Sequence, residues 1–161
     1  MRLYNELSNN LQIDYSEPIC DRAKLDTGTH CNYRCEFCYY KTQLNDVTEF
    51  DTIKQRIDYI AACGIQEVDL SGGESSIHKQ WFDILDYCTS KGLKISTLSN
   101  GYKFADKEFL QKSREHGLRE ILFSVHGYDK ESHNILVGHR KGFENIIQAI
   151  ENAHELGIIV R

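Results

Sequence analysis

The feature that most constrains the fold is an alternation of short apolar segments with longer amphipathic ones after residue 20. The short segments indicate β-strands, expected at residues 22–27, 67–70, 93–98, 120–125 and 158–160. The longer segments carry apolar residues at helical spacing, with helices expected at about 48–64, 76–92, 106–117 and 143–156. Strands that alternate with helices form βα units on a parallel sheet, which right-handed crossovers curl toward a barrel. The sequence therefore predicts an α/β fold, a partial (β/α)-barrel of parallel strands that is truncated in the fifth strand.

Three of the expected helices begin at side chains that can accept hydrogen bonds from free backbone N–H groups. These expected N-terminal residues are Thr48, Ser76 and Asp106. The same helices are followed by glycines that suit a C-terminal stop, at Gly64, Gly92 and Gly117. The last helix is expected to bury Phe143, Ile146, Ile147 and Ile150.

Length and composition indicate one globular domain, since 40% of the 161 residues are hydrophobic and 27% are charged. The formal net charge of −5 argues against a general binder of nucleic acid. No apolar run approaches the ~18 residues of a membrane span, so no membrane partner is expected. We expect a polar N-terminal arm at residues 1–20 and a core domain at 21–161. Because the chain ends within an apolar strand, we expect it to be the front part of a longer polypeptide.

The six cysteines are expected to be thiols or metal ligands rather than disulfides, because no export signal precedes them. A reducing cytoplasm is the expected compartment. Three of the cysteines, Cys20, Cys63 and Cys88, are scattered along the chain and are expected to be buried free thiols.

The other three, Cys31, Cys35 and Cys38, lie within eight residues of one another. Three such thiolates can hold one compact metal centre, and they leave a cubane iron–sulfur cluster one ligand short. An open metal position is a place for chemistry. The alternative is a structural zinc site, but zinc normally takes four ligands, and the nearby His30 is poorly placed beside Cys31.

Polar or glycine-rich clusters follow the expected strands, at residues 72–74, 99–101 and 124–127. Active sites of parallel α/β folds form beyond the carboxyl ends of the strands. These clusters and the cysteine loop are therefore expected on one rim. Each cluster also has a simpler reading as a turn or a helix start.

Two of these motifs resemble those of the radical S-adenosylmethionine (SAM) superfamily. Cys31-x3-Cys35-x2-Cys38, with Phe37 before the third cysteine, is similar to its cluster motif, and Gly72-Gly73-Glu74 is similar to its SAM-amine motif. The resemblance covers roughly residues 21–161. One departure is Ser75, which stands where the superfamily usually has proline.

The resemblance implies two cofactors, a 4Fe–4S cluster and SAM. Cys31, Cys35 and Cys38 would ligate three irons, and SAM would chelate the fourth through its amine and carboxylate. Phe37 would pack beside the cluster or the adenine.

The resemblance also implies roles for residues at the strand ends. Gly72 and Gly73 would let the backbone approach the methionyl amine, because glycine has no Cβ, and Glu74 would contribute negative charge. Ser124 would contact the carboxylate or the ribose of SAM. Ser99 and Asn100 would face SAM or the substrate. His126 is a weak candidate for a proton donor or substrate contact, against a reading as an ordinary loop histidine.

The implied activity is reductive cleavage of SAM at the cluster to a 5′-deoxyadenosyl radical, which abstracts hydrogen from a peptide or small-molecule substrate. An electron donor such as a flavodoxin or ferredoxin is the implied partner. Two alternatives remain open at this point, a cluster-binding but inactive subunit and a structural zinc-binding domain.

Overall fold

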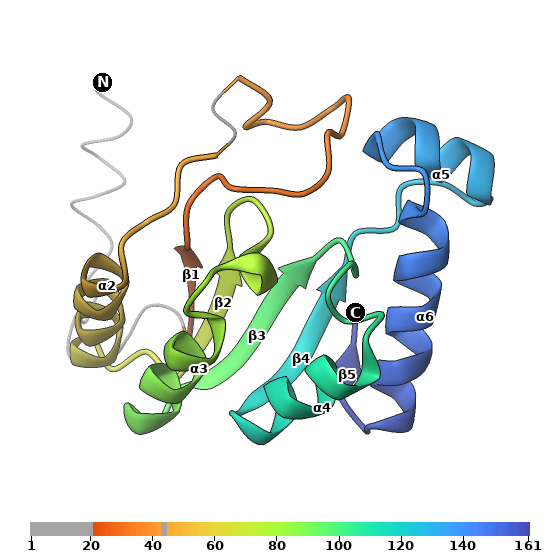
Figure 1. Cartoon of the computed structure of the whole chain (residues 1–161). Helices are drawn as coiled ribbons and strands as arrows, with labels where there is room; N and C mark the ends of the chain where they lie inside the picture. The colour runs from red at the N-terminus through yellow and green to blue at the C-terminus, as the bar shows by residue number, and fades with distance from the viewer. Residues whose placement is uncertain (1–20, 43–44) are drawn as a thin grey trace, which may run out of the picture.

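The computed structural model describes residues 21–42 and 45–161, which leaves the expected arm and Cys20 outside the described residues. Its strands form one sheet in the order β1-β2-β3-β4-β5, and every neighbouring pair is parallel (Figure 1). They are β1 (Arg22–Asp26), β2 (Glu67–Ser71), β3 (Lys94–Ser99), β4 (Leu118–Phe123) and β5 (Ile159–Val160). The sheet is not closed, so the predicted partial barrel of parallel strands is confirmed.

Helices connect the strands in the expected alternation. They are α2 (Phe50–Ala62), α3 (Trp81–Ser90), α4 (Lys107–Glu115), α5 (Lys130–Val137) and α6 (Gly142–Glu155). A 3₁₀ turn, η1 (Ser75–Ile77), precedes α3. No helix among the described residues combines the length and the apolar character needed to cross a membrane.

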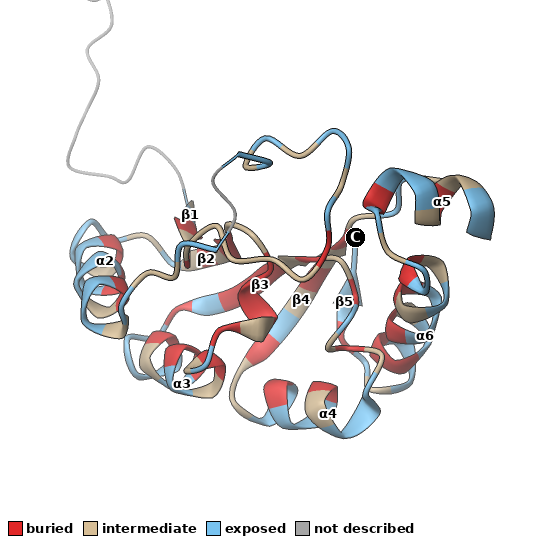
Figure 2. Ribbon diagram, turned by 45° about the horizontal axis from the view of Figure 1, so that its top comes forward, coloured by how far each residue is buried: buried red, intermediate tan, exposed pale blue. Residues whose placement is uncertain are grey.

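The sheet has one apolar face, which is covered by helices. In β2, the fully buried Val68 and Leu70 belong to the same core as side chains from four helices. In Figure 2 the buried parts of these helices lie on the side nearer the sheet. The helical members of this core include Ile53, Ile57, Trp81, Ile84, Leu85, Leu110 and Ile146. Burial of this apolar surface is the main favourable contribution to folding.

The opposite face of the sheet is polar. Glu67 and Asp69 alternate with the core residues of β2, and Arg22 of β1 contacts their carboxylates at 2.5 and 2.9 Å. Arg161 forms an ion pair with Glu120 of β4 on the same network. A parallel sheet covered by helices on both faces is apolar on both. The ion pairs therefore indicate a sheet with its helix layer on one side only.

Two of the expected helix starts were wrong. In both cases the expected N-cap residue forms hydrogen bonds with a residue that follows a strand, and the helix begins later in the chain. Thr48 does not cap α2, since its N–H donates to Thr27 O and the N-cap residue is Glu49. Ser76 does not cap α3, since it lies in η1 and donates to the carboxylate of Glu74. Asp106 does cap α4, through bonds from two backbone N–H groups, as predicted.

Three further expectations differ from the structure. Strand β4 lies two residues earlier than predicted, because the fully buried Leu118 already pairs with Ile95 of β3. Helix α5 was not predicted, since only His133 and Val137 of its eight residues are buried and no apolar stripe marks it. Ile147 of α6 was expected in the core but is 37% exposed, while Ile146 is buried.

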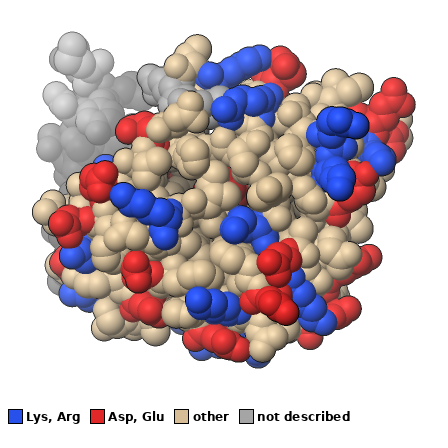
Figure 3. All heavy atoms as spheres, viewed as in Figure 1, with Lys and Arg blue, Asp and Glu red and all other residues tan. Residues whose placement is uncertain are grey.

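The surface carries charges of both signs. On the face shown in Figure 3, Lys and Arg side chains are interspersed with Asp and Glu side chains. This face therefore has no broad area of one sign of the kind that attracts a polyanion.

Candidate active site

The structure brings all of the predicted site residues around one cavity of about 380 Å³, here called the site cavity. They are Cys31, Cys35, Phe37, Cys38, Gly72, Gly73, Glu74, Ser99, Asn100, Ser124 and His126. They come from the loop after β1 and from the carboxyl ends of β2, β3 and β4 (Figure 1). Parallel strands end at one edge of the sheet, which is why segments so distant in sequence meet here.

The three cysteines are free, half-buried thiols on the wall of this cavity. Burial raises the pKa of Cys31, and burial together with the neighbouring Cys31 and Cys38 raises the pKa of Cys35 to about 11. The backbone N–H of Tyr33 donates to Cys31 Sγ at 3.5 Å. Without a metal the thiols of Cys31 and Cys35 are protonated at neutral pH, and ligation would release their protons.

The arrangement fits an iron–sulfur cluster better than a single ion. Within the described ranges, no group of three or more His, Cys, Asp and Glu side chains converges as one metal ion would require. A cubane cluster instead takes each thiolate on a different iron. The thiols share the site cavity with the strand-end segments, which would contact a ligand of the fourth iron.

The loop that carries the cysteines is held by helix α5. The backbone N–H groups of Arg34 and Glu36 donate to Val137 O at 3.1 Å and Leu136 O at 2.9 Å. These are carbonyls of the last helical turn, which have no partner within a helix. Gly138 follows with φ +62°, and a Cβ there would lie 2.5 Å from Arg34 O. The helix that sequence reasoning missed therefore positions the cysteine loop.

Tyr33 anchors the same loop in the protein interior. Its side chain is only 1% exposed, and its ring stacks on His139 with centroids 4.3 Å apart. Asn145 Nδ2 donates to its hydroxyl at 3.1 Å. Burial raises the pKa of Tyr33 to about 12, so the hydroxyl is neutral. A buried tyrosine between two cysteines fixes the loop against α6.

The two glycines allow two loops to approach closely. A Cβ on Gly72, which has φ +119°, would lie 2.1 Å from Gly28 O, and a Cβ on Gly73 would lie 2.1 Å from His30 O. The Gly73 N–H donates to Gly28 O at 2.8 Å. Glycine is therefore needed here for contact with the chain that enters the cysteine loop.

Glu74 lies at the centre of this contact and is 3% exposed. Its carboxylate accepts hydrogen bonds from Ser76, from Ser99 Oγ at 3.0 Å and from Asn100 N at 2.7 Å. Burial raises the pKa of Glu74, while these donors oppose the rise. The side chain thus links the end of β2 to the end of β3.

The loop after β4 completes the cavity. Ser124 N–H donates to Ser99 O at 3.0 Å, and the ring of His126 lies 4.4 Å from that of Phe37, which is 53% exposed. The His126 N–H donates to Nδ1 of the fully buried His133 in α5. Burial lowers the pKa of His126, which favours the neutral imidazole.

Sequence reasoning missed four residues of the cavity wall: Tyr39, Ser71, Leu98 and Val137. Ser71 and Leu98 are strand positions next to predicted ones, and strand alternation could have identified them. Val137 depends on helix α5 and had no sequence signal.

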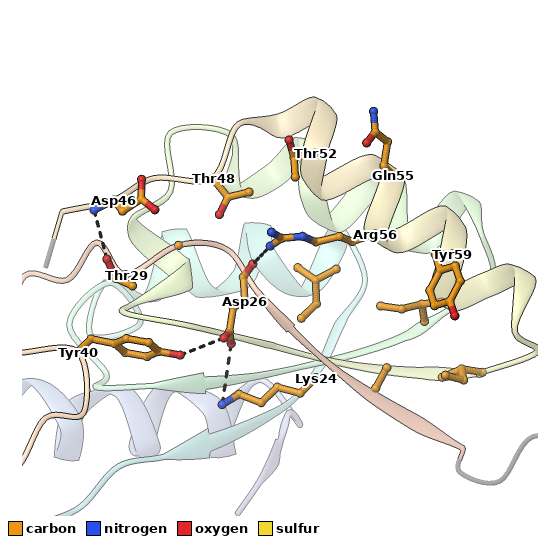
Figure 4. A pocket seen from close by; sticks show the side chains of 15 residues that line it. Lys24, Asp26, Thr29, Tyr40, Asp46, Thr48, Thr52, Gln55, Arg56 and Tyr59 are labelled. Atoms are coloured by element: carbon orange, nitrogen blue, oxygen red, sulfur yellow. Dashed lines mark hydrogen bonds and ion pairs between the residues drawn. The ribbon is translucent and has the colours of Figure 1, made fainter. Parts of the chain in front are cut away.

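A larger cavity of about 910 Å³ lies between β1 and α2 and contains none of the predicted site residues. In Figure 4, Asp26 is linked there to Tyr40, Lys24 and Arg56. Among the described residues that line it there is no thiol and no strand-end glycine pair, so its size alone does not make it the active site.

Of the remaining cysteines, Cys88 is a buried free thiol as predicted. Cys63 is exposed, and the expectation that it is buried was wrong. It follows the last residue of α2, where the helix end leaves it in solvent.

Comparison with known proteins agrees with this geometry. The profile of the Radical SAM superfamily matches residues 25–160. The chain belongs to the radical SAM superfamily. The cofactors of this superfamily are a 4Fe–4S cluster and SAM, as the sequence implied, and its members are enzymes.

Curated relatives of this radical SAM chain include GTP 3′,8-cyclases. That of Vibrio parahaemolyticus is 33% identical over 142 residues, which cover 83% of this chain and 42% of the relative. That of Mannheimia succiniciproducens is 27% identical, with 83% and 41% covered. The chain therefore spans about two fifths of the length of these relatives.

Two solved structures have the same fold as this chain. SuiB of Streptococcus suis matches with a TM-score of 0.70 and 19% identity, over 99% of this chain and 41% of SuiB. Methylornithine synthase (PylB) matches with a TM-score of 0.71 and 22% identity, over 86% of this chain and 42% of the synthase. At these identities the likeness shows the fold alone.

Proposed function

We propose that this chain is the cluster- and SAM-binding part of a radical SAM enzyme. The observation that carries the proposal is the single cavity shared by Cys31, Cys35 and Cys38 and the strand-end segments. When bound, the cluster and SAM supply reductive cleavage of SAM to a 5′-deoxyadenosyl radical that abstracts a substrate hydrogen.

The chain's own residues would bind and orient these groups. The three cysteines would ligate three irons, and residues 72–74, 99–100 and 124 would face SAM. Phe37 would cover the cluster or the adenine, since it is 53% exposed beside His126. His126 remains a candidate for a proton donor or substrate contact, and its lowered pKa disfavours the protonated form that a proton donor needs.

The substrate is proposed to be a peptide or a small molecule. GTP is the first to test, because the relative that is 33% identical is named a GTP 3′,8-cyclase. A peptide is the second, because SuiB has also been solved bound to its precursor peptide SuiA. An electron donor such as a flavodoxin or ferredoxin and a reducing cytoplasm are part of the same proposal.

The test uses the full-length polypeptide, reconstituted with iron and sulfide without oxygen. Dithionite and SAM should then yield 5′-deoxyadenosine, measured by liquid chromatography and mass spectrometry. A cluster-loaded sample that yields none, and whose spectrum does not respond to SAM, would support the inactive-subunit alternative. Zinc without iron or sulfide in protein purified anaerobically would support the zinc-binding alternative.

A further inference from the structure

Glu74 is the most deeply buried carboxylate of the site, and it is engaged by the protein on both oxygens. Oε1 accepts from Ser76 N at 3.4 Å, Ser76 Oγ at 2.5 Å and Ser99 Oγ at 3.0 Å. Oε2 accepts from Asn100 N at 2.7 Å. A carboxylate offers about four acceptor positions, so these donors already use most of its capacity.

Glu74 forms no ion pair with any Lys, Arg or His side chain among the described residues. Burial of an unpaired charge is unfavourable unless hydrogen bonds compensate it. These donors come from η1 and from the end of β3, and its own N–H donates to His30 O at 2.8 Å. The residue therefore joins three segments of the site.

Asn100 continues this chain of contacts toward the thiols. Its side-chain Nδ2 donates to Asn32 Oδ1 at 3.0 Å and lies 3.9 Å from Cys31 Sγ, as a donor to the sulfur. Its Oδ1 accepts from Tyr102 N at 3.0 Å, which fixes the orientation of the amide. Hydrogen bonds to ligating sulfurs help set the reduction potential of an iron–sulfur cluster.

We propose that Glu74 is a positioning residue rather than a charge for the cofactor amine, and that it holds Asn100 so that the Asn100 amide donates to the Cys31 thiolate. The bond from Asn100 to the Cys31 thiolate rests on the proposed function, because it requires a bound cluster. The contact between Glu74 and Asn100 is independent of the proposed function. If hydrogen bonding is what matters, glutamine can replace Glu74 with loss of only the 3.4 Å bond from Ser76 N, because the hydroxyls of Ser76 and Ser99 can rotate to accept from its NH₂ group. Leucine cannot.

The first experiment compares Glu74→Gln and Glu74→Leu in the full-length polypeptide without metal. Hydrogen exchange of the Asn100 backbone N–H should remain close to wild type in Glu74→Gln and accelerate by about tenfold or more in Glu74→Leu. Glu151→Gln, an exposed carboxylate on α6, is the control for the change of charge. Equal exchange in all variants would overturn the proposed clamp.

The second experiment uses reconstituted protein. SAM affinity should stay within about threefold of wild type in Glu74→Gln and fall by about tenfold in Glu74→Leu. An equal large loss in both variants, with the Asn100 amide still protected in Glu74→Gln, would show that the charge matters and would contradict the proposal.

The third experiment tests the thiolate contact without SAM. Asn100→Ala removes the donor to Cys31 Sγ, so the reduction potential of the cluster, measured by an EPR-monitored titration, should become more negative. An unchanged potential would overturn this part. If wild-type protein takes up no iron and sulfide, the proposed function fails, while the amide-exchange result still decides the role of Glu74.

Discussion

The two walls of the site cavity are held by different kinds of contact. The strand-end wall, formed by residues 71–74, 99–100 and 124, is buried or half-buried, with Glu74 3% and Ser99 2% exposed. The cysteine wall, formed by residues 31–39, is open, with Phe37 53% and Tyr39 92% exposed. The position of the strand-end wall is set by the sheet, since this wall consists of the ends of three paired strands. The second depends on contacts with α5 and α6 and on the buried Tyr33.

This difference indicates which substitutions act on chemistry and which act on stability. In the proposed function the cysteine wall supplies the metal ligands, and its position depends on a few anchors. The strand-end wall lies at the ends of the paired strands and contains no exposed residue. Substitutions in the two walls can therefore separate cluster binding from folding.

The largest effect is expected from replacing any ligand of the cysteine wall. Cys31→Ala, Cys35→Ala and Cys38→Ala should each reduce bound iron and sulfide to roughly a tenth of wild type or less, with little change in unfolding, since the thiols are only half buried. Iron and sulfide analysis after anaerobic reconstitution measures this. Cys63→Ala, an exposed thiol outside the cavity, is the control and should retain the cluster. Full cluster content in all three variants would contradict the ligand assignment.

The next effect concerns the anchor of the cysteine wall. Tyr33→Ala should lower the free energy of unfolding by about 3–5 kcal/mol, because a fully packed aromatic ring is lost. Tyr33→Phe should lower it by only about 1 kcal/mol, through loss of the hydrogen bond from Asn145.

Urea denaturation measures both changes. Tyr128→Ala, at a ring that is 93% exposed, should change the free energy of unfolding by about 0.5 kcal/mol or less. If Tyr33→Ala were no more destabilising than Tyr128→Ala, Tyr33 would not be an anchor.

A smaller effect is expected where α5 meets the cysteine wall. Gly138→Ala and Gly157→Ala both place a Cβ at positive φ, +62° and +66°, which is unfavourable by about 1–2 kcal/mol. Only the Gly138 Cβ meets another segment, since nothing lies within 4 Å of a Cβ at Gly157. Gly138→Ala should therefore be the more destabilising and should accelerate hydrogen exchange at Arg34 and Glu36. Equal effects of the two substitutions would argue against the contact between α5 and the loop.

The smallest effect tests the strand-end wall. Ser75 Oγ donates to Ser71 O at 2.9 Å and accepts from Thr27 Oγ1 at 3.2 Å, so hydrogen bonds hold the loop where the superfamily usually has proline. Ser75→Ala should lower the free energy of unfolding by about 1 kcal/mol. Ser90→Ala removes an exposed hydroxyl that bonds to Tyr87 O and should lower it less. The prediction would be contradicted if the two variants had the same stability in urea.

The strand-end wall is also the part that the sequence predicted best. Gly72, Ser99 and Ser124 were placed on one rim because parallel strands end at the same edge of a sheet. The cysteine motif identified its residues without saying what holds them. Helix α5 and the role of Tyr33 could not be predicted, because they depend on contacts between residues more than 100 positions apart, such as Tyr33 and Asn145. The role of Glu74 was also hidden, since its hydrogen-bond partner Asn100 lies on another strand end.

The most direct test of the account is the EPR spectrum of the reduced, reconstituted full-length polypeptide before and after addition of SAM. The account predicts the signal of a 4Fe–4S cluster that changes when SAM is added, because the cysteines leave one iron open to it. Loss of the signal in Cys35→Ala but not in Cys63→Ala should accompany this result. A wild-type cluster signal that SAM leaves unchanged would contradict the account.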